Sequence, residues 1–357
     1  MNQKFSPYSY LKIFRHAGKL EAIRNNTVTP PVYIRIKPIN VCIHHCSYCS
    51  YHDQNLKLHT LFNYKDTLPY EIMTALVEDI LEMGVKAVTF SGGGEPLLYP
   101  RINEVMPRLL EGGVDLSIIT NGQMLKDQSA RVLAQAKWVR VSMDSCDAAL
   151  YARIRDIPES WFHDVCDNIR NFSRIKNPDC ELGVNFVVTP DNAGDAYAMA
   201  RFVKDLGADH IKMTAMVAKD LDVLHAPFKA QVIRDIQKAK NDLEDEGFKV
   251  INKYEDDFEM NTVFQRVYSR CPIQQIVTVV AADAKVYLCH DKAYMPNGEL
   301  GDLRAQRFQE IWFSDSVRKR FREFDAAREC RHHCVFDQRN RLINDYFDLN
   351  DDHVNFI

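Results

Sequence analysis

Residues 42–49 read Cys-Ile-His-His-Cys-Ser-Tyr-Cys and carry three cysteines with the spacing C-x3-C-x2-C. Three thiolates so close in sequence fit on one tight loop. They can bind three irons of a 4Fe-4S cluster and leave the fourth iron open to another ligand. The alternative is a zinc site, which would need His44 or His45 as a fourth ligand to close its tetrahedral shell. The segment therefore indicates a metal site, with either an open iron or a closed zinc.

The composition of the 357-residue chain is ordinary, with 46% hydrophobic residues, 26% charged residues and a formal net charge of −4. This balance gives no sign of binding to nucleic acid or to a membrane surface. The first thirty residues contain no signal-peptide core, and no run of about eighteen apolar residues occurs anywhere. We therefore expect a cytoplasmic protein whose ten cysteines serve metal or redox chemistry rather than disulfide bonds.

From residue 32 onward, short β-rich runs alternate with helical segments, which is the pattern of a parallel α/β sheet or barrel. The predicted strands span residues 32–36, 87–90, 114–119, 138–143, 183–188 and 210–213. The predicted helices span residues 70–83, 101–111, 127–136, 161–175 and 193–206, with Gly84 and Gly207 at expected C-caps. The predicted strands end in polar or glycine-rich residues, and we expect the chemistry at these carboxyl ends.

Two of these strand ends carry patterns that suit ligand binding. Residues 91–96, Ser-Gly-Gly-Gly-Glu-Pro, follow the second strand. Consecutive glycines let the backbone pass close to a ligand, and the carboxylate of Glu95 suits a cationic amine; a plain glycine turn is the alternative. On the fourth strand Ser142 and Asp144 alternate with apolar residues, so we expect both to point into the barrel mouth. Cys146 would then face the same pocket.

Asn185 on the fifth predicted strand and Lys212 on the sixth are further candidates for the pocket wall. Each is equally compatible with an ordinary polar residue near a strand end, so the sequence leaves their role open.

Four more cysteines lie after residue 270. Cys271 and Cys289 bracket two β-like runs, which predicts a hairpin over residues 276–288 with a cysteine at each outer end. Cys330 and Cys334 follow a predicted helix over residues 308–321. The four thiolates could complete a fully ligated iron-sulfur site. A structural zinc ribbon is the alternative, with the following histidines as substitute ligands: His290, His332 and His333.

The cysteine loop, with Tyr48 directly before its third cysteine, resembles the signature of the radical S-adenosylmethionine (SAM) superfamily. The resemblance implies a partial (β/α)6 TIM-like barrel and a 4Fe-4S cluster whose open iron is chelated by SAM. The implied cluster ligands are Cys42, Cys46 and Cys49. The residues implied to hold SAM are Tyr48, Gly93, Gly94, Glu95, Ser142, Asp144 and Arg155.

Within this set the resemblance implies a separate role for each group. The segment 93–95 would contact the amino group of the SAM methionine moiety, and Ser142 and Asp144 would hold ribose hydroxyls. Arg155 would pair with the SAM carboxylate, although the sequence is equally compatible with a solvated surface arginine.

The C-terminal cysteines are similar to the SPASM/twitch-type extension of this superfamily, which carries an auxiliary cluster. Twelve residues separate Cys271 from Ala284 and four separate Ala284 from Cys289, which fits the family spacing, but alanine replaces the family glycine. The resemblance implies one auxiliary 4Fe-4S cluster on Cys271, Cys289, Cys330 and Cys334.

We expect four segments along the chain. They are an N-terminal helical lead-in over residues 1–31, a radical SAM barrel over residues 32–215, a helical connection over residues 216–268 and an auxiliary-cluster domain over residues 269–357. The lead-in is too short for the leader-peptide-binding domain that often precedes the cysteine loop in peptide-modifying relatives. This favours a small polar metabolite, such as a sugar or aminocyclitol, over a peptide or protein side chain.

The resemblance also implies the reaction. An external one-electron reductant such as flavodoxin or ferredoxin would reduce the cluster, SAM would be cleaved to a 5'-deoxyadenosyl radical, and the radical would take a hydrogen atom from the substrate. Dehydrogenation or epimerisation would follow, with Cys146 as a candidate hydrogen donor if it is not simply a buried core residue. A non-catalytic iron-sulfur electron carrier is the alternative of another class, but it would not need the SAM-binding motifs.

Overall fold

The computed structural model describes residues 8–53, 56, 58–256, 258, 265–349 and 352. The remaining positions of the predicted lead-in, connection and auxiliary-cluster domain lie outside the described residues. One sheet of ten strands forms the centre of the molecule, in the order β10-β9-β8-β1-β2-β3-β4-β5-β6-β7. Its strands are β1 (Tyr33–Ile36), β2 (Ala87–Phe90), β3 (Asp115–Thr120), β4 (Trp138–Ser142), β5 (Glu181–Val188), β6 (His210–Ala215), β7 (Lys249–Asn252), β8 (Val277–Val280), β9 (Lys285–Tyr287) and β10 (Glu299–Asp302).

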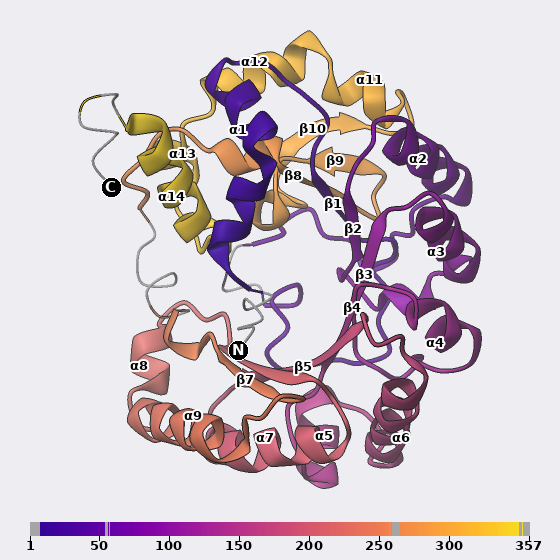
Figure 1. Ribbon diagram of the computed structural model, residues 1–357, viewed down its shortest axis with the longest axis vertical. Coiled ribbons are helices and arrows are strands. Elements are labelled where there is room, and N and C mark those ends of the chain that lie inside the picture. The colour runs from indigo at the N-terminus through magenta and orange to yellow at the C-terminus, as the bar shows by residue number, and fades with distance from the viewer. Residues whose placement is uncertain are drawn as a thin grey trace.

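Helices surround this sheet on its outer side, as Figure 1 shows. The barrel helices are α2 (Tyr70–Glu82), α3 (Ile102–Glu111), α4 (Asp127–Leu133), α5 (Ala148–Arg155), α6 (Ser160–Ile175), α7 (Ala196–Asp205), α8 (Leu221–His225) and α9 (Lys229–Leu243). The helices near the two ends of the chain are α1 (Ala17–Arg24), α11 (Phe308–Trp312), α12 (Asp315–Glu323), α13 (Ala326–Glu329) and α14 (Asp337–Asp348).

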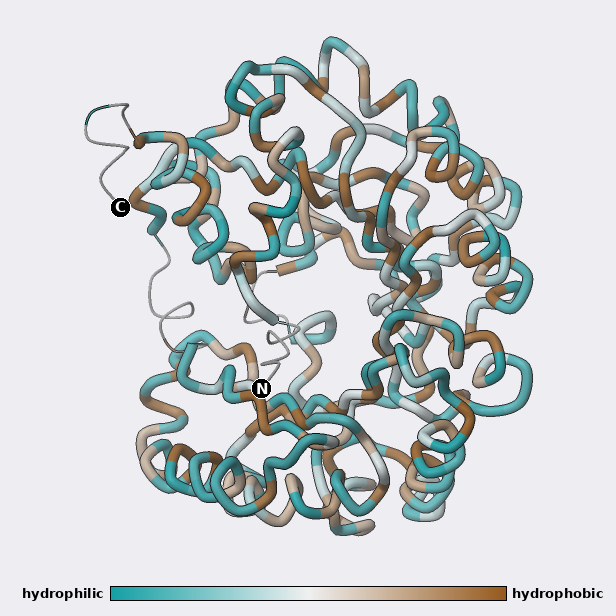
Figure 2. Tube along the Cα trace, in the orientation of Figure 1, coloured by the Kyte–Doolittle hydropathy of each residue, from teal (hydrophilic) through white to brown (hydrophobic). Residues whose placement is uncertain are grey.

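Strands β1 to β7 pair in parallel with their sequence neighbours, which puts all their carboxyl ends at one rim. Alternate residues of these strands are fully buried under the helices, such as Ile34, Val88 and Val139, while the residues between them face the lumen. Brown segments in Figure 2 mark the apolar strands and the helix sides that cover them. The chain therefore forms a barrel in which polar side chains of the strands lie in the lumen and at the rim.

The predicted fold class, a partial barrel of six strand–helix units with a C-terminal extension, is confirmed, and the six predicted strands end within two residues of their observed ends. Gly84 and Gly207 adopt positive φ angles of 69° and 86°, as expected at helix ends. One prediction was incomplete, because the connection over residues 216–268 contains β7, which pairs with β6 as a seventh parallel strand.

The C-terminal hairpin continues the barrel sheet and does not form a sheet of its own. Strand β8 pairs in parallel with β1, and β9 pairs with β8 in the antiparallel sense. Ala284, in the hairpin turn, has a φ of 59°, so alanine adopts there the left-handed conformation that a glycine would favour. The auxiliary cysteines are thus attached to the barrel by backbone hydrogen bonds. The predicted domain limits, however, stay predictions.

The two ends of the described chain pack against each other. Leu20 and Ile23 of α1 share a small buried cluster with Ile276 and with Ile343 and Phe347 of α14. Figure 1 shows α1 and α14 next to each other beside β8. Within the described residues, no helix combines the length and apolar character needed to cross a membrane.

Candidate functional site

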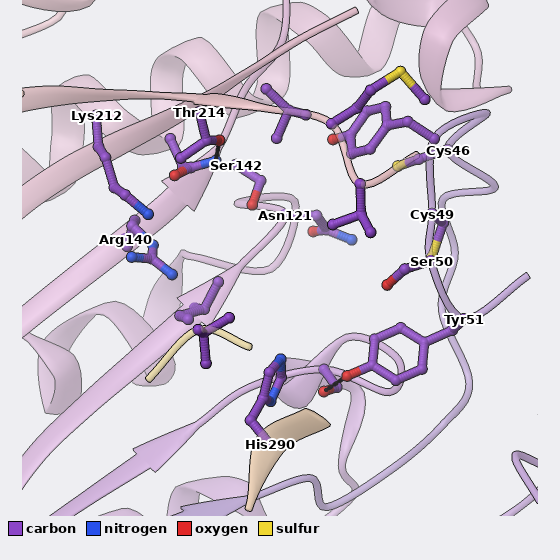
Figure 3. A pocket seen from close by; sticks show the side chains of 18 of the residues that line it. Cys46, Cys49, Ser50, Tyr51, Asn121, Arg140, Ser142, Lys212, Thr214 and His290 are labelled. Atoms are coloured by element: carbon purple, nitrogen blue, oxygen red, sulfur yellow. Dashed lines mark hydrogen bonds between the residues drawn. The ribbon is translucent and has the colours of Figure 1, made fainter. Parts of the chain in front are cut away.

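A cavity of about 490 Å³ opens at the carboxyl rim of the barrel. Cys42, Cys46 and Cys49 all line it, and Figure 3 shows Cys46 and Cys49 on one side of this space. The sequence prediction that the cysteine loop and the strand ends meet at one site therefore agrees with the geometry. The size and concave shape suit a ligand of the size of a nucleoside or larger.

The end of helix α5 fastens the cysteine loop to the barrel. The amide of His45 donates to the carbonyl of Arg155 at 2.9 Å, and the amide of Ser47 donates to the carbonyl of Ile154 at 2.9 Å. These carbonyls belong to the last turn of α5 and have no partner inside the helix, so the loop satisfies them. The helix ends there because Asp156 takes a left-handed conformation with a φ of 50°.

A buried ion pair lies directly beneath the loop. Arg155 Nη2 and Asp144 Oδ2 are 2.5 Å apart, and their side chains are 1% and 0% exposed. The Tyr48 hydroxyl donates to the same Asp144 oxygen at 2.5 Å, and the Val187 amide donates to Oδ1 at 3.1 Å. Tyr48 and Arg155 still reach the cavity wall, but Asp144 does not line it.

The expectation that Asp144 holds a ribose hydroxyl does not agree with this geometry, because its side chain is fully buried and does not line the cavity. The physical reason is the end of β4 at Ser142. Beyond that residue the alternation of a strand no longer applies, so Asp144 and Cys146 do not follow Ser142 into the cavity. Cys146 packs against the apolar core instead, and the prediction that it faces the pocket does not agree with this geometry either.

The histidines of the loop are not arranged as ligands for a zinc ion. His44 Nδ1 lies 3.2 Å from Arg155 Nη1, and its ring packs near Trp161, while His45 lies against Tyr64 on the exposed side. In the part of the chain that the structure describes, no three Cys, His, Asp or Glu side chains converge on a point where one metal ion could bind. A 4Fe-4S cluster gives each cysteine its own iron corner, so separated thiols around a shared space fit a cluster better than a single ion.

Burial raises the pKa of the Cys42 thiol to about 12, and it also raises the pKa values of Cys46 and Cys49. All three thiols are therefore protonated at neutral pH in the metal-free chain, and metal binding must release their protons.

The glycine segment packs against the chain that leads into the cysteine loop. A Cβ atom on Gly93 would overlap Asn40 Oδ1, and one on Gly94 would overlap the carbonyl of Val41. The amides of Gly94 and Glu95 donate to the carbonyls of Ile39 and Val41, each at 3.0 Å. These amides are thus used by the protein. Neither amide is therefore free to donate to a ligand.

Glu95 lines the cavity but is 2% exposed. Its Oε1 accepts from the Leu97 amide at 3.0 Å and from the Thr120 hydroxyl at 2.7 Å, and its Oε2 accepts from the Asn121 amide at 2.6 Å. Burial raises the pKa of this carboxyl group. Glu95 therefore joins the ends of β2 and β3 while presenting one side to the cavity, where an ammonium group would compensate its charge.

A chain of hydrogen bonds connects the two cysteine regions. Lys37 is fully buried. Its Nζ donates to the Tyr51 hydroxyl and, at 2.9 Å, to the carbonyl of Gly92. The same Nζ lies 3.5 Å from His290 Nδ1. Tyr51 follows Cys49 by two residues and His290 directly follows Cys289. This role of Lys37 could not be predicted from the sequence, because a lysine at the end of a short strand usually faces solvent.

Polar residues of β4, β5 and β6 form the remaining wall. Ser142 is paired in register with Asn185, and Asn185 with Lys212, so the three side chains lie in one row across three strands. All three line the cavity, as does Arg140, one step lower on β4. Asn185 and Lys212, whose role the sequence left open, thus belong to the site, and Arg140 was not foreseen.

The four C-terminal cysteines surround a second, smaller pocket beside the barrel. Cys271, Cys289, Cys330 and Cys334 all line it, together with Tyr268 and Asn340. Burial, together with a smaller contribution from the nearby Cys330 thiol, raises the pKa of the Cys271 thiol to about 12. Four soft donors around one enclosed space suit a fully ligated cluster.

Comparison with known families agrees with this geometry. The profile of the radical SAM superfamily matches residues 36–203, and that of the SPASM iron-sulfur cluster-binding domain matches residues 271–335. The chain belongs to the radical SAM superfamily. The cofactors of this radical SAM protein are a 4Fe-4S cluster with SAM and an auxiliary iron-sulfur cluster in the SPASM domain.

Curated relatives of this radical SAM protein match over part of the chain. A GTP 3',8-cyclase of Thermodesulfovibrio yellowstonii is 35% identical over 119 residues, which cover 32% of this chain and 35% of the relative. An S-adenosylmethionine-dependent nucleotide dehydratase of Flammeovirga pacifica is 30% identical over 175 residues, covering 48% of this chain and 58% of the relative. The chain therefore spans about a third to somewhat more than half of the length of these relatives.

Solved structures share the fold of this radical SAM protein over most of its length. Streptococcus suis SuiB bound to S-adenosylmethionine matches with a TM-score of 0.63 at 15% identity, covering 87% of this chain and 72% of SuiB. The anSMEcpe protein with bound AdoMet matches with a TM-score of 0.60 at 18% identity, covering 89% of this chain and 96% of anSMEcpe. At these identities the likeness concerns the fold alone.

Proposed function

We propose that the protein cleaves SAM reductively at the N-terminal cysteine loop and uses the resulting radical to oxidise a small polar metabolite. The observation that carries this proposal is the shared cavity, which has three cysteines on one side and a polar wall on the other. Cys42, Cys46 and Cys49 would hold the cluster. When bound, this cluster supplies the single electron that cleaves SAM.

The protein's own residues then bind and orient the reactants. Glu95 presents its buried carboxylate to the methionine ammonium group, and Ser142 offers a hydroxyl to the ribose. Tyr48 and Arg155 hold the loop so that the cysteines keep their position relative to these groups.

Dehydrogenation agrees better with the cavity wall than epimerisation does. Epimerisation would need a hydrogen donor such as a thiol near the substrate. Among the described residues that line the cavity, the only thiols are those of the cysteine loop. The pocket of four cysteines, in contrast, offers a site for an auxiliary cluster that would accept the second electron from an oxidised substrate.

A small metabolite is supported by the cavity volume of about 490 Å³. The curated relatives carry the names of a GTP cyclase and a nucleotide dehydratase, which point in the same direction. We also propose that an external one-electron reductant, such as flavodoxin or ferredoxin, reduces the cluster.

Anaerobic reconstitution with iron and sulfide, followed by dithionite and SAM, tests this function. We expect 5'-deoxyadenosine, and about eight irons and eight sulfides per chain for two clusters. About four irons with one zinc would instead assign a zinc ribbon to the C-terminal cysteines. Cys42→Ala should abolish 5'-deoxyadenosine formation, whereas Cys180→Ala, a matched change at a buried cysteine far from both pockets, should not. Wild-type protein that is loaded with iron but forms no 5'-deoxyadenosine would contradict the proposal.

A further inference from the structure

Asn340 on helix α14 directs an amide into the pocket of the four C-terminal cysteines. Its Nδ2 donates to Cys271 Sγ at 3.3 Å, and its side chain is 1% exposed. The same pocket is lined by Cys289, Cys330 and Cys334. Among the described residues, Asn340 is the only side chain that donates a hydrogen bond to any of these four sulfurs. The four cysteines are therefore not equivalent.

The orientation of this amide is fixed by the protein. Its other end, Oδ1, accepts a hydrogen bond from the backbone amide of Ile273 at 3.1 Å. A backbone amide can only donate, so the oxygen of Asn340 must face Ile273 and its NH2 group must face the sulfur. The backbone amide of Asn340 donates in turn to the carbonyl of Phe336 at 3.0 Å, within the first turn of the helix. The fold itself therefore directs the N–H group at the sulfur.

A hydrogen bond from this amide stabilises negative charge on the sulfur. Burial raises the pKa of the Cys271 thiol, whereas the hydrogen bond from Asn340 acts in the opposite direction because it favours the thiolate. The backbone amides of Ile273 and Gln274 act in the same sense as Asn340. A cysteine that binds iron is a thiolate, and a cluster gains one more negative charge when it is reduced. Hydrogen bonds to its sulfur ligands therefore favour the reduced form of a cluster.

A second asparagine of α14 makes a purely structural contact with the same segment. Asn344 is 7% exposed, and its Nδ2 donates to the carbonyl of Arg270 at 3.1 Å and to that of Asn340 at 2.9 Å. It connects the helix to the residue directly before Cys271, and it does not line the pocket. Both asparagines hold α14 against this segment, but only Asn340 acts on the sulfur.

We propose that Asn340 is a positioning residue that raises the reduction potential of the auxiliary iron-sulfur cluster through its hydrogen bond to Cys271. This inference rests on the proposed function only for the use of that potential. In the proposed dehydrogenation, the 5'-deoxyadenosyl radical takes one hydrogen atom from the substrate. The substrate radical then loses a proton to water and one electron to the oxidised cluster. A higher potential makes the cluster a better acceptor of this electron, which an external one-electron carrier then removes.

Redox titration of the reconstituted full chain, followed by electron paramagnetic resonance (EPR) of the reduced clusters, tests this role. SAM binds to the first cluster, so the signal that SAM leaves unchanged belongs to the auxiliary cluster. Asn340→Leu removes the donor with little change in size, and the midpoint potential of the auxiliary cluster should fall. We expect the one-electron reduction equilibrium to shift by up to about tenfold, and tenfold corresponds to about 59 mV.

Asn344→Leu is the matched control, because it removes an amide from the same helix and the same segment but none from the sulfur. Its midpoint potential should stay at the wild-type value. An equal shift in both variants, or no shift in Asn340→Leu, would overturn the proposal.

A measurement on the wild type covers the case in which Asn340→Leu does not fold or bind iron. Asn340 is the only asparagine among the described residues that line the pocket. With ¹⁵N in the asparagine side chains, pulsed EPR should detect a nitrogen coupled to the reduced auxiliary cluster, and absence of this coupling would also contradict the proposal. These measurements need no turnover. A wild type that forms no 5'-deoxyadenosine would therefore contradict the proposed function and leave the role of Asn340 standing.

Discussion

The buried ion pair between Asp144 and Arg155 holds the cysteine loop in position. The pair is almost completely removed from water, and removal of charges from water costs several kcal/mol per ion. The hydrogen bonds that Asp144 accepts from Tyr48 and Val187 offset part of this cost. The result is a fixed connection between the end of β4, helix α5 and the cysteine loop.

Replacing the Asp144 carboxylate should therefore destabilise the folded protein strongly. Asp144→Asn leaves the Arg155 guanidinium buried without a counter-charge, and we expect a loss of about 3 kcal/mol or more in the free energy of unfolding. Denaturant titration of the metal-free protein measures this loss, and the iron content after reconstitution should fall in parallel.

Asp167→Asn provides the control for an exposed pair. Asp167 lies 3.0 Å from Arg170 on the surface of α6, where both side chains are well exposed, so the loss should stay below about 1 kcal/mol. Equal losses in the two variants would mean that the buried pair does not hold the loop.

The residues of the site were predictable from sequence only where a local pattern continues. The three cysteines and Ser142 line the cavity as expected, because loop spacing and strand alternation are local properties. Asp144 and Cys146 were misplaced because the strand stops at Ser142. Arg140 was missed because a lysine or arginine within a strand gives no sign of whether it faces solvent or a lumen.

At the level of elements, helix α8 meets the segment that follows strand β7 at a buried histidine. His225 is fully buried at the end of α8, its Nδ1 lies 2.8 Å from the Tyr254 hydroxyl, and its Nε2 has no partner. Burial, together with a smaller contribution from the neighbouring Lys229, lowers its pKa from 6.5 to about 4. The folded protein therefore keeps this histidine neutral.

This arrangement predicts a pH dependence of stability. Well above pH 6.5 the histidine is neutral in both states and contributes no slope. As the pH falls from about 6.5 towards 4, the unfolded chain binds a proton that the folded protein excludes, so stability decreases by at most about 1.4 kcal/mol per pH unit. Urea unfolding of the metal-free protein at several pH values measures this slope.

His225→Gln keeps a hydrogen-bonding group beside Tyr254 but cannot titrate, so its stability should depend less on pH than that of the wild type. His163→Gln, on the exposed side of α6, should leave the slope unchanged. Identical slopes in all three proteins would show that burial does not keep His225 neutral.

The elements themselves were predictable to different degrees. Long periodic helices such as α6 were recognised because their apolar spacing is clear. Strand β7 was missed since it has four residues, Lys249–Asn252, in a charged region. Its identity depends on pairing with β6, and pairing with a distant strand leaves no local pattern.

For the whole molecule, the decisive contact is the pairing of β8 with β1. Removal of residues 269–357 would expose the full edge of β1 and the apolar side chains of Leu20 and Ile23. An uncovered parallel edge is a site of aggregation. We expect a chain of residues 1–268 to associate or precipitate, and size-exclusion chromatography against the full chain checks this.

Hydrogen exchange on the soluble fraction gives a second measurement, because the amides on the β8 side of β1, such as those of Tyr33 and Lys37, should lose their protection. A monomeric truncated chain with protected β1 amides would show that the barrel folds without its C-terminal part.

The contact between α1 and α14 also sets an order of events during synthesis. Leu20 and Ile23 leave the ribosome roughly 250 residues before Ile276 and still earlier than Ile343, with which they share one buried cluster. Until translation is almost finished, this first helix lacks its apolar neighbours and remains available to chaperones. Iron delivery to the cysteine loop, which follows closely behind in the chain, therefore has a time window in which the barrel is still open on that side.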